Sequence, residues 1–136
     1  MIRFISSFCV IFLICFGCVT DNYSKISDRV YTGTFQRQLA FGGGDTAHIS
    51  ITFSGNTWTG VSDKSNYPAL CHGTYTIKNH KISFINDCEW ITQFDWTLIL
   101  GGDYDFRYTD NQLNINRDNK GPATDTYVDI YNLTRK

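Results

Sequence analysis

The sequence predicts an all-β fold, an antiparallel up-and-down β-barrel of about eight strands. Apolar and polar residues alternate with period two in short segments, which turn dipeptides interrupt roughly every 8–12 residues. Phe, Tyr, Thr and Asn are abundant, and no segment repeats apolar residues at helical spacing, so strands and turns are favoured over helices. A length of 136 residues fits one domain with its own core.

Alternation and turn signals divide the chain into expected strands and connections. The strands fall at 30–40, 46–54, 57–62, 70–78, 81–88, 96–100, 104–109, 112–117 and 126–134. The turns fall at Gly55-Asn56, Asn79-His80, Gly101-Gly102-Asp103 and Asp110-Asn111. We expect 89–95 to form a single helical turn or an irregular crossing. The connections 41–46 and 63–69 are expected to shape the mouth of the barrel.

The strand 46–54 shows the alternation clearly. Ile49, Ile51 and Phe53 share one side of it, and His48 lies on the other. We therefore expect His48 to face solvent. The glycine-rich run 41–45 before this strand joins two strands and has no following Lys, so it predicts a flexible mouth loop and not a phosphate site.

A two-residue loop at Asn79-His80 sets the register of the next hairpin. The residues that face each other on one side are then Ile77 with Ile82, Tyr75 with Phe84, and Cys71 with Cys88. At a non-hydrogen-bonded pair the two Cα atoms lie about 4.5 Å apart, within disulfide range. The register therefore predicts a Cys71–Cys88 disulfide. Two thiols without a CxxC spacing or partnering histidines make a poor zinc site, so no metal is expected.

The loop Asp110-Asn111 sets a second hairpin with one apolar face. Its facing pairs are Tyr108 with Leu113, Phe106 with Ile115, and Tyr104 with Arg117. A three-residue loop at 101–103 would add Trp96, Leu98 and Leu100 to that face. Consecutive antiparallel hairpins with one apolar face close most economically into a barrel, because a barrel leaves no unpaired edge.

The first residues read as a bacterial lipoprotein signal peptide. Arg3 supplies the positive start, 4–16 the apolar core, and Gly17-Cys18 a small residue followed by a thiol. The alternatives are an ordinary secretory signal and a transmembrane helix. The apolar stretch 4–19 spans about 16 residues, fewer than the roughly 20 that a membrane-spanning helix needs.

Acylation of Cys18 would tether the protein to a membrane. We therefore expect residues 1–17 to be a removed signal, 18–27 a tether and 28–136 the barrel domain. The expected location is the bacterial cell envelope, as an outer membrane lipoprotein held by the lipid on Cys18.

The strand that carries Gly33-Thr34-Phe35, the hairpins that follow and Arg135 at the end of the last strand form a pattern that resembles the lipocalin or calycin barrels. The chain looks like the small lipocalin-like envelope lipoproteins of Bacteroidetes type, over about residues 28–136. Phe35 stands where lipocalins usually carry Trp. The resemblance implies that Phe35 plugs one barrel end with Arg135 packed over it. It also implies binding of small apolar molecules in the barrel, without naming a ligand.

The inward-facing aromatic residues are the expected ligand-binding surface. The candidates for the barrel lining are Trp58, Tyr75, Phe84, Trp96, Tyr104, Phe106 and Tyr108. They predict that a small apolar or amphipathic ligand binds in the barrel. The same side chains could instead fill the barrel as a closed core. The alternative function is then a protein-interaction module, an envelope scaffold or a hydrolase inhibitor, that uses Trp58, Trp90 and the loop 63–69.

Other chemistry finds little support in the sequence. Neither a nucleophile motif nor a cofactor or phosphate motif is present, so we expect no enzyme and no cofactor. The formal net charge is −1 and the basic residues are scattered, which argues against nucleic acid as a partner.

His48, His72 and His80 lie on separate strands or turns. His72 has the opposite parity to Cys71 and Tyr75, so it is expected to point away from the apolar face.

Carboxylates beside tryptophans leave one enzymatic hypothesis open. Asp87, Glu89 and Asp95 flank Trp90 and Trp96, an arrangement typical of sugar sites. Glycosidase chemistry needs two such carboxylates about 5–10 Å apart. It also needs one of them to have a raised pKa.

Overall fold

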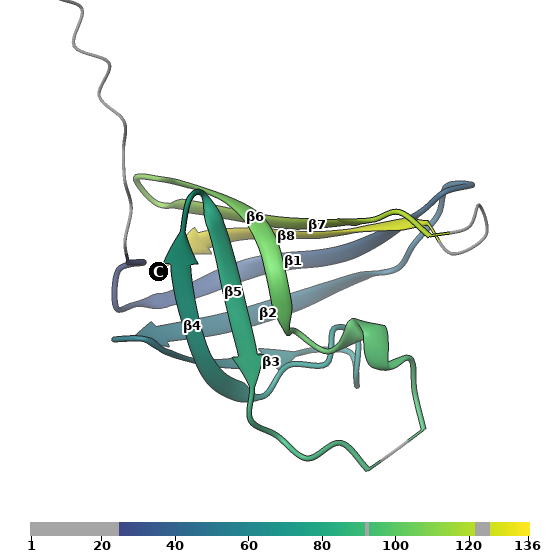
Figure 1. Cartoon of the computed structure of the whole chain (residues 1–136), viewed down its shortest axis with the longest axis horizontal. Helices are drawn as coiled ribbons and strands as arrows, with labels where there is room; N and C mark the ends of the chain where they lie inside the picture. The colour runs from purple at the N-terminus through teal and green to yellow at the C-terminus, as the bar shows by residue number, and fades with distance from the viewer. Residues whose placement is uncertain (1–24, 92, 122–125) are drawn as a thin grey trace, which may run out of the picture.

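The chain folds into a closed antiparallel barrel of eight strands. The computed structural model describes residues 25–91, 93–121 and 126–136, and Figure 1 shows the strands wrapped around one axis. The elements are β1 Val30–Leu39, β2 Thr46–Ser54, β3 Thr57–Ser62, β4 His72–Lys78, β5 Lys81–Asn86, the 3₁₀ helix η1 Trp96–Leu98, β6 Gly102–Thr109, β7 Gln112–Asn119 and β8 Tyr127–Arg135. Each strand pairs with the next, and β1 pairs with β8. The predicted up-and-down barrel is confirmed.

The strand order gives the barrel two unlike ends. One end, which we call the turn end, holds the tight turns β2–β3, β4–β5 and β6–β7. The other, the loop end, holds the longer connections β1–β2, β3–β4, β5–β6 and β7–β8. The segments 41–46 and 63–69, which were expected to shape a mouth, belong to loop-end connections. In Figure 1 the β5–β6 connection runs out from the barrel wall and returns through η1 to β6.

Residues before β1 close the turn end. Ile26 is fully buried in the core. The Ser27 hydroxyl lies 2.8 Å from the Tyr108 hydroxyl, and Asp28 Oδ1 accepts a hydrogen bond from the Gly55 amide. The prediction that the tether continues to residue 27 is therefore wrong. Residues 25–27 belong to the barrel domain because Ile26 supplies apolar surface to its interior.

Both predicted hairpins form, and each ladder contains two of its three predicted facing pairs. Asn79 and His80 adopt positive φ angles of 50° and 60°, as a type I′ turn requires. The β4–β5 ladder pairs Ile77 with Ile82 and Tyr75 with Phe84. The β6–β7 ladder pairs Tyr108 with Leu113 and Phe106 with Ile115.

The segment predicted as a strand at 96–100 is not one. Trp96–Leu98 form η1, and the Asp95 carboxylate caps this turn by accepting a hydrogen bond from the Thr97 amide. Ile99 makes only an isolated bridge with Ala69, and β6 begins at Gly102. Apolar residues do alternate in this segment, but the Asp95 cap determines its structure and makes it a helical turn. Among the described residues, no helix is long and apolar enough to cross a membrane.

The roles implied for Phe35 and Arg135 are only half met. Phe35 is buried, as a structural residue should be, but it pairs with Tyr131. Arg135 pairs with Tyr31 and is exposed, four residues along β1 from Phe35. The expectation that Arg135 packs over Phe35 is wrong, since four residues of strand span about 13 Å. Position 33 requires glycine for a separate reason, because a Cβ there would collide with the carbonyl oxygen of Asn132 on β8.

The predicted disulfide between Cys71 and Cys88 is present. The two Cα atoms lie 6.4 Å apart, farther than the expected 4.5 Å or so of a paired position. The reason is that the β4–β5 ladder ends at Gly73 and Asn86, so both cysteines lie beyond it. The bond therefore lies just beyond the ladder, next to the hydrogen bond from the Asp87 amide to the His72 carbonyl.

Removing this disulfide should lower the stability of the barrel. Its 17-residue separation gives a loop-closure contribution of about 3 kcal/mol. We expect the double variant C71S/C88S to lose about that much free energy of unfolding in urea. The wild type measured in a thiol reductant is the matched comparison. A loss below about 1 kcal/mol would show that the unfolded chain is already restrained without the bond.

Candidate functional site

A buried ion cluster lies at the loop end of the barrel. Arg37 of β1 donates from Nε to Asp129 Oδ1 over 2.6 Å and from Nη2 to Oδ2 over 2.9 Å. Arg117 of β7 donates from Nη2 to the same Oδ2 over 3.1 Å. Arg37 is only 6% exposed and Asp129 only 1%. The cluster therefore joins β7, β8 and β1 through charges that are buried at Arg37 and Asp129 and 24% exposed at Arg117.

The same arginines fix the β5–β6 connection against the barrel. Arg37 Nη1 donates to Asp95 Oδ2 over 3.0 Å and to the Thr97 hydroxyl over 2.7 Å. The Thr97 carbonyl accepts from Nη2 of both Arg37 and Arg117, each over 3.0 Å. Arg117 Nη1 donates to the Gly101 carbonyl. All five N–H groups of Arg37 are thus used, and η1 is held at the barrel rim.

The cluster contains equal numbers of positive and negative side chains, since Arg37 and Arg117 pair with Asp95 and Asp129. Burial alone would raise the pKa of Asp95, but the Thr97 hydroxyl, the Thr97 amide and the Arg37 guanidinium together lower it below its usual value. Asp95 is therefore a stable carboxylate. The enzymatic hypothesis needs a carboxyl with a raised pKa, and Asp95 has the opposite shift. Asp87 and Glu89 are exposed to solvent.

A surface depression runs across this cluster, in two adjoining parts. The first has a volume of about 420 Å³ and is lined by Arg37, Leu39, Asp95, Thr97, Asn119, Thr126 and Tyr127. The second, of about 410 Å³, is lined by Trp96, Thr97, Ile99, Gly101, Arg117, Asn119 and Tyr127. The two parts share Thr97, Asn119 and Tyr127. We call their union the rim depression.

Aromatic side chains gather on the β5–β6 connection beside the rim depression. The ring of Phe94 stacks on Trp96 with centroids 6.3 Å apart and meets Trp90 edge-on at 5.6 Å. Trp96 is 59% exposed. The prediction that Trp96 lines the barrel interior is therefore wrong. It stands at the edge of the rim depression, because η1 turns it away from the core.

The other predicted lining residues divide between the core and its margin. Trp58, Tyr75, Phe84 and Tyr104 are buried, whereas Phe106 and Tyr108 are half-buried against them. Phe84 is the centre of the packing, with edge-to-face contacts to Trp58 at 5.6 Å and to Tyr104 at 5.8 Å. These side chains contact one another across the interior.

Buried hydroxyl groups show how dry this interior is. Burial raises the pKa of Tyr104 to about 12 and raises that of Tyr131 as well. The Tyr104 hydroxyl has no partner at hydrogen-bonding distance and angle among the described residues. It still lies close enough to the Tyr131 hydroxyl for each group to shift the pKa of the other.

The ion cluster was missed by the sequence reasoning, although a signal was present. Arg37 has the inward parity of Phe35 on β1, and Asp129 has that of Tyr131 on β8. Opposite charges at inward positions of two strands that pair with each other predict a buried salt bridge. Arg37 and Asp129 face each other in the β1–β8 register.

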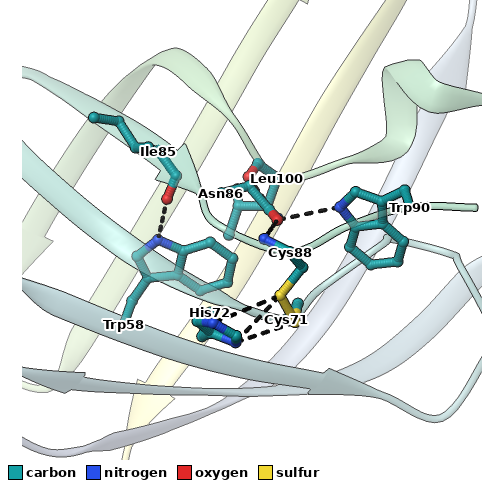
Figure 2. Close-up of a disulfide and its surroundings, with 8 residues drawn as sticks. All are labelled: Trp58, Cys71, His72, Ile85, Asn86, Cys88, Trp90 and Leu100. Atoms are coloured by element: carbon teal, nitrogen blue, oxygen red, sulfur yellow. Dashed lines mark hydrogen bonds between the residues drawn. A yellow bond between two sulfur atoms is a disulfide. The ribbon is translucent and has the colours of Figure 1, made fainter.

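His72 is exposed, as its parity predicts, but the sequence did not show that it contacts the disulfide. Figure 2 shows its ring beside the disulfide, with Nδ1 3.3 Å from Cys71 Sγ and 3.2 Å from Cys88 Sγ. Alternation was extended from β4 to Cys71, but β4 begins only at His72. Because Cys71 lies outside the strand, its side chain need not point opposite to that of its neighbour. His72 can therefore be exposed, as expected, and still lie against the disulfide; His48 is exposed as expected, and so is His80.

Comparison of the chain with protein-family models, with curated proteins and with solved structures finds no match.

Proposed function

We propose that this chain is a lipid-anchored, lipocalin-like protein of the bacterial cell envelope that binds a small amphipathic ligand. The lipid would be attached at Cys18, in keeping with an outer membrane lipoprotein. The ligand would bind in the rim depression at the loop end, with its apolar face on Trp96. The observation that carries this proposal is the exposed indole of Trp96 beside a depression lined by hydrogen-bonding side chains.

The contacts inside the barrel favour the rim over the interior. Trp58, Phe84 and Tyr104 pack edge-to-face across the space that an enclosed ligand would need. Ligand pockets of drug-sized molecules have volumes of about 300–1,000 Å³. Each part of the rim depression reaches that range. A ligand at the rim requires no rearrangement of the core.

The chemistry of the rim depression favours a neutral polar ligand with an apolar face. Two guanidinium groups oppose two carboxylates, and Arg37 has no free N–H to offer an anion. Asp95 keeps an exposed carboxylate that can accept from hydroxyl groups. A saccharide fits this set, because one face of a pyranose ring is apolar and stacks on indole, while its hydroxyl groups both donate and accept.

Replacing Trp96 with Ala should abolish most of the binding without unfolding the protein. We expect affinity for a bound saccharide to fall about tenfold or more, which corresponds to roughly 1.4 kcal/mol. The measurement is calorimetric titration of the full chain in detergent with neutral cello-, malto- and chito-oligosaccharides. Ile85→Ala, which removes an exposed apolar residue from β5, is the matched control and should bind like wild type.

Two results would contradict parts of this proposal. Wild-type chain that binds none of the three saccharide series would remove the ligand class. A saccharide that binds Trp96→Ala as tightly as wild type would place the ligand elsewhere, with the interior beside the Tyr104 hydroxyl as the next location to test.

The second candidate function is a protein-interaction module with a filled barrel. It is favoured by the exposed apolar residues of the loop end, with Ile91 91% and Phe41 86% accessible. A protein partner that covers them would form a stoichiometric complex with the chain. Ile91→Ser should then weaken that complex, whereas it should leave saccharide binding unchanged.

A further inference from the structure

We propose that Cys71, Cys88 and His72 form a redox-gated binding site for Zn²⁺. In the oxidised chain the two sulfurs are joined and offer no thiolate. Reduction would release two thiol ligands beside an imidazole that already lies against both of them. This site is separate from the rim depression and does not depend on the proposed function.

The three ligand atoms are already grouped. All lie within 4.8 Å of one another. His72 Nδ1 is 3.3 Å from Cys71 Sγ and 3.2 Å from Cys88 Sγ. In a tetrahedral zinc site, Zn–S distances of about 2.3 Å and Zn–N distances of about 2.0–2.1 Å place sulfur and nitrogen about 3.5 Å apart. Only the two sulfurs must separate, and breaking their bond permits this.

The backbone around the site is held by contacts that do not involve the disulfide. The Cys88 amide donates to Asn86 Oδ1, which also accepts from the Trp90 indole (Figure 2). The Cys71 carbonyl accepts from the Gly60 amide over 2.7 Å, and the His72 carbonyl accepts from the Asp87 amide over 3.0 Å. Reduction should therefore leave the three ligands close together.

The site is also accessible. His72 is exposed, and both cysteines are half-exposed. Three protein ligands leave the fourth position of a tetrahedral zinc ion for water, as in open zinc sites. The gate is the two-electron reduction of the bond. A dithiol gives two electrons and two protons to Cys71 and Cys88 and is itself oxidised to a disulfide. Zn²⁺ then displaces the two thiol protons to solvent.

The test uses the full chain with Cys9, Cys15 and Cys18 replaced by Ser, so that Cys71 and Cys88 are its only cysteines. A trialkylphosphine reduces the bond without competing as a thiol ligand, and it becomes the phosphine oxide with the oxygen of one water. Co²⁺ is titrated as a spectroscopic probe, followed by Zn²⁺ in competition with a chromogenic chelator. We expect a thiolate-to-cobalt charge-transfer band in the reduced chain and none in the oxidised chain.

Variants separate a three-ligand site from two adventitious thiols. His72→Ala should weaken Zn²⁺ binding by at least the roughly 10–100-fold that loss of a supporting residue causes, because it removes a direct ligand. His48→Ala, which removes another exposed histidine, should bind like the parent chain. Equal affinity in His72→Ala and the parent chain would overturn the proposal, as would a reduced parent chain without a charge-transfer band.

Near-ultraviolet circular dichroism of the aromatic core keeps the test decisive if reduction unfolds the barrel. In that case Zn²⁺ should restore the core signal of the parent chain and fail to restore that of His72→Ala. A reduced chain that stays unfolded with Zn²⁺ would overturn the proposal.

Discussion

Replacing Asp129 with Asn is expected to lower the free energy of unfolding by about 3–5 kcal/mol, the usual cost of removing one partner from a buried ion pair. Asn has nearly the same shape as Asp, so the loss would come from charge and not from a cavity. Urea denaturation followed by circular dichroism measures it.

The expected size of this effect follows from how the carboxylate is shared. Asp129 is the acceptor for three N–H groups, two from Arg37 and one from Arg117. Without its charge, two guanidinium groups remain at the rim with only Asp95 as a counter-charge, and Asp95 is half-exposed. Arg37 would keep its positive charge, because the pKa of a guanidinium lies far above neutral pH. The penalty is therefore desolvation of an unpaired cation.

Asp105→Asn provides the matched control. Asp105 pairs with Lys81 over 2.7 Å, but more than half of each side chain is exposed. Exposed pairs of this kind contribute about 0–1 kcal/mol. If the two Asn variants were equally stable, burial would not be the source of the stabilisation at Asp129.

The second large effect is expected at Trp58. Truncation to Ala should cost about 3–5 kcal/mol of unfolding free energy, as for other buried aromatic residues. Trp58 is 1% exposed, and its ring contacts Phe84 edge-on at 5.6 Å. Its indole N–H donates to the Ile85 carbonyl of β5 (Figure 2). The same N–H also donates to the Thr74 carbonyl of β4, so it bridges the two strands. The variant therefore loses packing and leaves a cavity between these strands.

Trp96→Ala is the natural comparison for Trp58→Ala. Both tryptophans had been expected to line the barrel, yet Trp96 stands mostly in solvent. Its truncation should change stability by less than about 0.5 kcal/mol, the usual range for surface substitutions. Thermal unfolding of the two variants side by side would measure this contrast. A large loss in Trp96→Ala would mean that the β5–β6 connection is part of the stabilising core.

The predictions that succeeded rest on local geometry. Period-two alternation and the dipeptides Asn79-His80 and Asp110-Asn111 fix which residues face each other in a hairpin, so the pairings and the Cys71–Cys88 bond could be derived by counting. Counting also found the Cys71–Cys88 bond, which lies two residues beyond the ladder. It failed at Trp96, where the Asp95 cap makes a helical turn.

The candidate site was harder to predict because its contacts are long-range. Arg37 and Asp95 are separated by 58 residues, and Arg37 and Asp129 by 92. No local pattern joins them. The depression beside Trp96 is lined by Thr97, whose carbonyl Arg37 and Arg117 hold at the barrel rim. The sequence placed Asp95 and Trp96 close together along the chain, but it could not show that both lie at the barrel rim, outside the core.

The burial of Ile26 at the turn end has a consequence for orientation. Seven residue steps separate Cys18 from Lys25, which at about 3.5 Å each allow a reach of at most about 25 Å. In the proposed lipid-anchored form the turn end therefore stays next to the bilayer. The loop end then points into the aqueous space, where Trp96 would meet water-soluble molecules before it could meet membrane lipids.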